Sequence, residues 1–115
     1  MSIILAGYVF SGPKGVKDYM EEDAIDVIDG IYGIFYLKNP EKRVADFGIL
    51  YLGDTEEIKS EGFPATHKKF ASWVEGAKSE ENLYMGICPT PGLMPKKKEL
   101  IYRHLLYKYN PPCNR

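Results

Sequence analysis

The sequence predicts an α+β fold, in which helices flank a small, mainly antiparallel sheet of three to four strands. Two β-prone segments, residues 30–37 and 47–53, are separated by a short turn and have the spacing of an antiparallel hairpin. Two later segments, around residues 70–77 and 95–109, carry apolar residues at helical spacing. A further β-prone run, residues 82–88, lies between these helices, which favours helices packed on a mixed sheet.

The length predicts a single domain. The chain has 115 residues, of which 44% are hydrophobic and 13% aromatic. A chain of this size can bury one modest core. We expect residues 1–29 to add a strand and an acidic segment to a core formed by residues 30–114.

The N-terminal part begins with a predicted strand. Residues 3–10 are apolar and β-prone, and they end at Ser11-Gly12-Pro13, which is typical of a turn. Residues 15–29 are acidic with scattered apolar positions. This segment predicts a loop that contains a short helical turn.

The hairpin segment alternates strictly, which is a strand signal. Ile31, Phe35 and Leu37 share one face, and Tyr32, Ile34 and Tyr36 share the other. The next residues, 38–42, have turn chemistry. A second strand over residues 47–53 then completes the hairpin.

Two helices follow. After the polar residues 54–62, a helix is predicted beyond Pro64 with Thr66 as its N-cap. Pro95 suits the first turn of a second helix, which we expect to end near Tyr109 because Pro111 and the next proline cannot continue it.

Charge is segregated along the chain although the net charge is only −1. Residues 18–29 carry six acids and no lysine or arginine. Residues 96–108 carry five bases against one acid, and the candidate nucleic-acid-binding residues are Lys96, Lys97, Lys98, Arg103 and Lys108. The two segments are either solvated faces of opposite sign or interaction surfaces.

The remaining composition favours a cytoplasmic protein. Cys88 and Cys113 are too few for a disulfide framework and lack metal-ligand spacing, so we expect reduced thiols. No apolar run has the roughly 20 residues needed to span a bilayer. The first residues also lack the basic start of a signal peptide. We therefore expect no membrane partner.

Two tripeptides at hairpin spacing carry a family resemblance. Gly30-Ile31-Tyr32 opens the first hairpin strand and Tyr51-Leu52-Gly53 closes the second, and the chain later ends in Tyr109-Asn110-Pro111-Pro112-Cys113-Asn114. Together these segments resemble the GIY-YIG nuclease family, in which a hairpin carries both tripeptides and a later helix runs into a Tyr-x-Pro-x-x-Asn-type ending. The segment His67-Lys68-Lys69-Phe70-Ala71-Ser72-Trp73 is similar to the His-Lys…Trp helix of one small bacterial branch. The resemblance covers residues 30–114.

The resemblance implies phosphodiester hydrolysis in a site lined by Tyr32 and Tyr51, which would orient or activate water, and supported by Asn114. It also implies an arginine that binds phosphate and a glutamate that holds a divalent metal. This chain has Glu61 at the arginine position and Tyr102 at the glutamate position. The loss of both groups would remove several kcal/mol of transition-state stabilisation.

Two residues could compensate for these losses. Glu99 precedes Tyr102 by three residues on roughly the same helical face, and it could hold Mg²⁺ or Mn²⁺ if the helix shifted by nearly a turn. His67 could serve as a general base near neutral pH, or it could be a surface residue at a helix start.

Three functions are therefore open. The first is a nuclease-like domain with impaired catalysis, which acts as a nucleic-acid-binding or regulatory module. Its partner would be DNA on the basic helix or a protein on the acidic segment. The second is an active Mg²⁺- or Mn²⁺-dependent endonuclease that uses Glu99 or an acid between Asp54 and Glu61. The third is a protein-interaction domain without nucleic acid, and whether the chain is an enzyme stays open.

Overall fold

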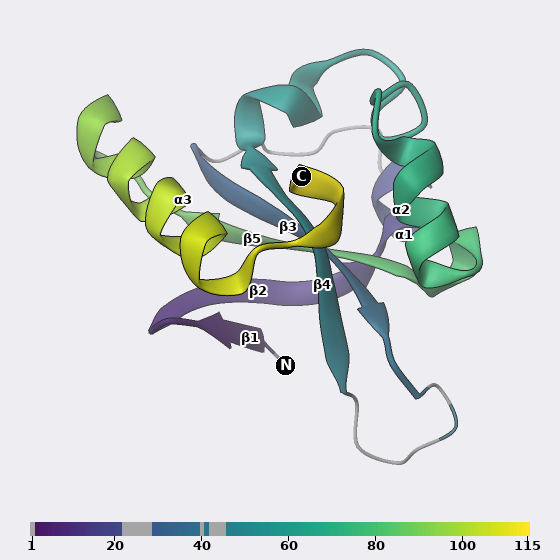
Figure 1. The fold of residues 1–115 in the computed structure, drawn as a ribbon. Coiled ribbons are helices and arrows are strands. Elements are labelled where there is room, and N and C mark those ends of the chain that lie inside the picture. Colours follow the sequence, from purple (N-terminus) through teal and green to yellow (C-terminus); the bar gives the residue numbers. More distant parts are fainter. Residues whose placement is uncertain (1, 22–28, 40, 42–45) are drawn as a thin grey trace.

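The computed structural model describes residues 2–21, 29–39, 41 and 46–115, without the side chains of residues 19–21. The described residues form one antiparallel sheet in the order β1-β2-β5-β3-β4 (Figure 1). Its strands are β1 (Ser2–Leu5), β2 (Tyr8–Gly15), β3 (Gly30–Leu37), β4 (Phe47–Asp54) and β5 (Leu83–Pro89). The α+β prediction is confirmed, but the sheet has five strands where three to four were expected.

The additional strand comes from the N-terminal segment. The single strand predicted over residues 3–10 is wrong, because the chain turns back at Ala6 and Gly7, which have φ values of 51° and 85°. Two successive residues with positive φ make a tight hairpin between β1 and β2. The turn predicted at residues 11–13 is also wrong, since these residues lie inside β2. The register against β5 shifts between Ser11 and Lys14, so a bulge accommodates the glycine and proline there.

The central hairpin follows the sequence prediction. β3 pairs with both β4 and β5, and β5 in turn pairs with β2. Its alternation separates two cores: Tyr32 and Ile34 face one side of the sheet, whereas Ile31 and Phe35 face the other. The strands end within one residue of their predicted limits.

The helices lie on both faces of the sheet (Figure 1). They are α1 (Val16–Glu21), α2 (Phe70–Ala77) and α3 (Pro95–Tyr109), with short 3₁₀ turns η1 (Thr55–Lys59), η2 (Glu80–Asn82) and η3 (Pro112–Asn114). The short helical turn expected in residues 15–29 is present as α1, while residues 22–28 lie outside the described part. None of the described helices has the length and apolar character needed to cross a bilayer.

The start predicted for α2 is wrong. The helix begins at Phe70 with Lys69 at its N-cap, and the preceding residues form hydrogen-bonded turns. The Thr66 hydroxyl donates to the Glu61 carbonyl at 2.8 Å instead of accepting from the first turn of a helix. α3, in contrast, has the predicted limits, and Asn110 ends it in the left-handed conformation with φ 43°.

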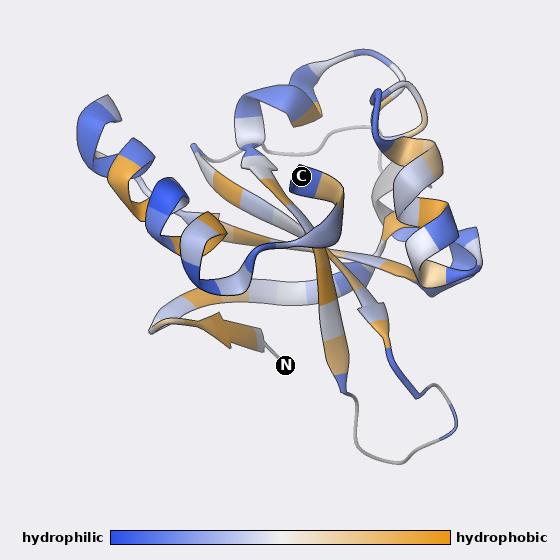
Figure 2. Cartoon of the chain, in the orientation of Figure 1, coloured by the Kyte–Doolittle hydropathy of each residue, from blue (hydrophilic) through white to orange (hydrophobic). Residues whose placement is uncertain are grey.

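Figure 2 shows apolar segments in the strands, whereas polar and apolar segments alternate along the helices. One core lies under α2 and includes Tyr32, Tyr51 and Trp73. The other lies under α3 and includes Phe35 and Leu105. The sheet therefore separates an aromatic core from the helix that carries the basic residues.

Candidate functional site

The two motif tyrosines meet on the α2 face of the sheet. Tyr32 lies opposite Gly53 and Tyr51 lies opposite Ile34 in the β3–β4 register. Their ring centroids are 5.9 Å apart, and both side chains are buried. A Cβ atom on Gly53 would come within 2.5 Å of the Tyr32 ring. The glycine of the second tripeptide is therefore required for the ring to lie across β4.

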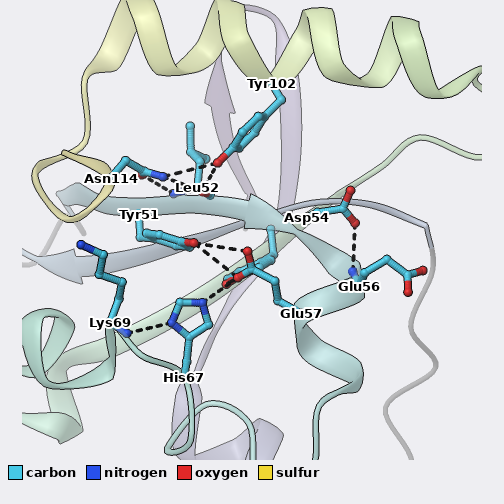
Figure 3. Close-up of polar contacts among 10 residues, drawn as sticks. Tyr51, Leu52, Asp54, Glu56, Glu57, His67, Lys69, Tyr102 and Asn114 are labelled. Carbon is cyan, nitrogen blue, oxygen red and sulfur yellow. Dashed lines mark hydrogen bonds and ion pairs between the residues drawn. The ribbon is translucent and has the colours of Figure 1, made fainter.

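Glu57 is the centre of this site. Its Oε2 accepts a hydrogen bond from the Tyr32 hydroxyl at 2.6 Å, and the Tyr51 hydroxyl lies 3.3 and 3.4 Å from its two oxygens. His67 Nε2 lies 2.7 Å from the same Oε2. Figure 3 shows Tyr51 of β4 and His67 of the segment before α2 pointing toward the carboxylate of Glu57 in η1. Three donors thus surround one anion that belongs to the chain itself.

The hydrogen bonds of His67 assign its tautomer. The backbone N–H of Lys69 donates to Nδ1 at 3.0 Å, so Nδ1 is an acceptor and Nε2 carries the proton that it donates to Glu57. The imidazole stacks on Trp73 with centroids 4.6 Å apart, and only 8% of its side chain is exposed. His67 lies three residues before α2, not at the helix start that the sequence predicted. Its general-base role stays a prediction. In this arrangement both ring nitrogens are engaged, Nδ1 by the Lys69 N–H and Nε2 by Glu57.

Burial and Glu57 both keep the tyrosines protonated. Burial, followed by the hydrogen bond to Glu57, raises the pKa of Tyr32 far above its ordinary value. Burial and the negative charge of Glu57 also raise the pKa of Tyr51. Each hydroxyl is therefore a persistent donor, and a tyrosinate that could deprotonate water is disfavoured.

The turn η1 places Glu57 over the strands. The Asp54 carboxylate caps η1 by accepting from the Glu56 backbone N–H at 2.9 Å. Thr55 is buried, and its hydroxyl accepts from the Gly30 N–H at 2.9 Å and donates to the Gly30 carbonyl at 3.2 Å. The prediction of an acid between residues 54 and 61 did not distinguish Glu57 from its neighbours. The sequence signal for Glu57 was Asp54, a suitable N-cap residue, followed by Glu56 and Glu57. This pattern is typical of the start of a helical turn, here directly after the second tripeptide.

Asn114 and Tyr102 lie on the other side of β4 (Figure 3). Asn114 accepts from the Leu52 N–H and donates to the Leu52 carbonyl, both at 2.8 Å. The Tyr102 hydroxyl donates to the same carbonyl at 3.0 Å. The side-chain amide of Asn114 therefore pairs with the backbone of Leu52 as a residue of an adjoining strand would. It provides hydrogen-bond partners for the N–H and carbonyl groups at this edge of β4. Tyr102 has a backbone partner at the position where the resemblance expected a metal ligand.

A pocket of about 470 Å³ lies next to the site. Its charged lining residues are Asp29, Asp54, Glu57, Lys98 and Glu99. Lys98 donates to Asp29 and lies 3.1 Å from Asp54, and only 12% of its side chain is exposed. Burial by itself would lower the pKa of Lys98, but the hydrogen bonds to both carboxylates outweigh it and raise the pKa. Lys98 is thus paired with two carboxylates, and carboxylates still outnumber lysines in the lining of the pocket.

The residues present do not fit a divalent metal. Within the described ranges, no group of three or more histidine, cysteine, aspartate or glutamate side chains could hold one. Glu99 lies 2.8 Å from Arg103 and is more than half exposed. The carboxylate of Glu57 is engaged by hydroxyl and imidazole donors. Among the described side chains, Tyr102 stands where the resemblance implies the metal-binding glutamate, so the implied Mg²⁺ or Mn²⁺ lacks that ligand.

The five candidate nucleic-acid-binding bases are divided by their environment. Lys98 and Arg103 have acidic partners on or near α3. Lys96, Lys97 and Lys108 are exposed. The acidic partner surface expected over residues 18–29 lies largely outside the described residues, and Asp29, at its end, pairs with Lys98. The interaction proposed for that segment stays a prediction.

Comparisons with known proteins add no relative. No protein-family model matches the chain, and neither the curated proteins nor the solved structures include a significant match.

Proposed function

We propose that the chain is a GIY-YIG-like domain that binds nucleic acid and does not hydrolyse phosphodiesters. The observation that carries this proposal is Glu57, whose carboxylate accepts the donors of Tyr32, Tyr51 and His67. A phosphate oxygen would need those same donors. An anion already in their midst would repel it in a partly buried site.

The groups that would oppose this repulsion are missing. The position at which the family resemblance expects an arginine is Glu61, which is exposed. The position expected to hold a metal ligand is Tyr102, whose hydroxyl donates to a backbone carbonyl. Phosphodiester hydrolysis needs stabilisation of the growing negative charge, so both differences act in the same direction.

Binding is supported by a different surface. Lys96, Lys97 and Lys108 are exposed along α3, and the first turn of this helix contains no acid. Lys96 and Lys97 lie at the positive end of the helix dipole, which is unfavourable for their charges. An approaching anion would relieve this repulsion. Nucleic acid is the anion that such a row of cations would take up through its phosphates.

An active hydrolase is the second candidate. The Glu57 side chain is 35% exposed and lines the acidic pocket, so it could accept a proton from a water molecule. In that case the tyrosines would position the carboxylate. This activity would need a metal bound in part by the substrate or by water, since the described side chains include no cluster of three or more ligating groups.

Plasmid nicking with Mg²⁺ or Mn²⁺ separates the two candidates. We expect no nicking by the wild type, together with binding of labelled DNA at about 50 mM salt that weakens steeply as salt is raised. Metal-dependent nicking that disappears in both Glu57→Gln and Tyr32→Phe would establish the hydrolase instead. Glu56→Gln is the matched control, because this neighbouring carboxylate pairs with Lys59 and does not contact the tyrosines.

A further inference from the structure

The outward side of α3 carries an unusual mixture of side chains. Lys97, Leu100, His104 and Tyr107 follow one another at spacings of three and four residues and so form one ridge, here called the α3 ridge. Leu100 is 66% exposed and Tyr107 is 90% exposed. The opposite side of the helix supplies Leu105 to the core. Figure 2 shows apolar and polar segments alternating along α3.

Cations lie at both ends of the ridge. Lys96 and Lys97 lie in the first turn of α3, and Lys108 lies in the last. Lys108 Nζ is 5.8 Å from the centroid of the ring of Tyr109, the last residue of α3. Arg103 adds a further positive charge, although Glu99 offsets it. An exposed aromatic ring thus lies within a positively charged strip.

We propose that the α3 ridge binds single-stranded nucleic acid, with Tyr107 stacking on an unpaired base and the lysines contacting phosphates. This inference rests on the proposed nucleic-acid binding and names its substrate. From Lys96 to Lys108 the helix rises about 18 Å at 1.5 Å per residue. That length corresponds to about five phosphates at the spacing of roughly 3.4 Å that they have along one strand of duplex DNA.

The side chains favour a single strand over a duplex. In a duplex the bases are stacked on one another and offer no face to Tyr107. Every unpaired base has a π-face that an aromatic ring can cover, whatever its identity. Leu100 can contact the same unstacked bases, whereas a ridge that served only phosphates would gain nothing from it. The positive charge selects an anionic partner, and the exposed ring selects one with exposed bases.

The test measures fluorescence anisotropy with a labelled oligothymidylate and with a duplex of the same length, at about 50 mM salt. We expect the wild type to bind the single strand more tightly. Tyr107→Ala should weaken single-strand binding roughly tenfold, which is within the range for one base–aromatic stack. Its duplex binding should change little. Tyr107→Phe keeps the ring and should bind like the wild type, and Lys38→Gln removes one exposed charge away from α3 as a control.

Each contrary result identifies what has failed. Equal or tighter binding of the duplex would overturn the single-strand proposal while nucleic-acid binding stands. An unchanged affinity of Tyr107→Ala would do the same, because the ring would then not be stacking. No binding of either probe by the wild type would overturn both this inference and the binding role of the domain. Because Tyr107 is exposed, its variants should retain the wild-type unfolding midpoint, which confirms that only the surface has changed.

Discussion

The tyrosine–Glu57 site and the α3 ridge use similar residue types in opposite ways. In the site, Tyr32 is fully buried and its hydroxyl has a charged partner 2.6 Å away. On the ridge, Tyr107 is 90% exposed. The site holds its polar atoms in contact with one another, while the ridge leaves its ring and its lysines open to solvent. The difference teaches that the tripeptide tyrosines serve the interior of this fold, whereas the ridge of α3, to which we assign the proposed binding, is open to solvent.

Aromatic truncation should separate the two regions most strongly. The Trp73 ring is fully buried and packs against His67 and Tyr51, with centroids 4.6 and 5.1 Å away. Trp73→Ala should lower the free energy of unfolding by about 3–5 kcal/mol. Tyr107→Ala should change it by less than about 0.5 kcal/mol. Urea unfolding measures both, and equal losses would contradict the contrast.

The second test concerns the far side of β4. Asn114→Ala leaves the Leu52 N–H without its side-chain partner, while the Tyr102 hydroxyl still serves the Leu52 carbonyl. A buried, unsatisfied donor costs about 1–3 kcal/mol. Asn39→Ala at an exposed position after β3 is the matched control and should be nearly neutral. If both variants have the same urea midpoint, the side chain of Asn114 does not support the sheet edge.

The third test uses pH. Tyr32 and Tyr51 have raised pKa values in the folded protein, so their contribution to stability is complete below the unfolded value of about 10 and is lost as pH rises beyond it. Glu57→Gln removes the negative charge that, together with burial, raises the pKa of each tyrosine. Both tyrosines should therefore ionise at lower pH than in the wild type. Tyrosinate absorbance during alkaline titration measures this shift. Glu56→Gln should titrate like the wild type, and identical curves for both variants would contradict the assigned role of Glu57.

The smallest effect should distinguish the two sides of α3. Lys98 is 12% exposed and joins two carboxylates, whereas Arg103 is 73% exposed and joins one. Arg103→Met should change the free energy of unfolding by at most about 1 kcal/mol. Lys98→Met should cost more, because it leaves Asp29 and Asp54 facing one another without a cation. Urea midpoints at low and high salt test this order, and a larger loss for Arg103→Met would reverse it.

Several elements could be predicted because their signals are local. The alternation in residues 30–37 and the prolines at both ends of residues 95–109 gave β3 and α3 correctly. The N-terminal segment could not be predicted in the same way. Its turn depends on Ala6, which is not a residue typical of positive φ, and Gly12 and Pro13 are accommodated inside β2 by a bulge. Thr66 was mistaken for an N-cap because its hydroxyl satisfies a nearby carbonyl instead.

The sequence by itself determined the hairpin, the limits of α3 and the identity of the residues near the tripeptides, since these follow from side-chain period, turn chemistry and spacing. Only the tertiary structure decided what those residues do to one another. It turned η1 back over the strands so that Glu57 meets three donors, and it directed Tyr102 and Asn114 to the backbone of β4. It also faced Lys98 toward two acids and left Tyr107 in solvent. Hydrogen-bond partners and burial depend on segments distant in sequence, and no local pattern specifies them.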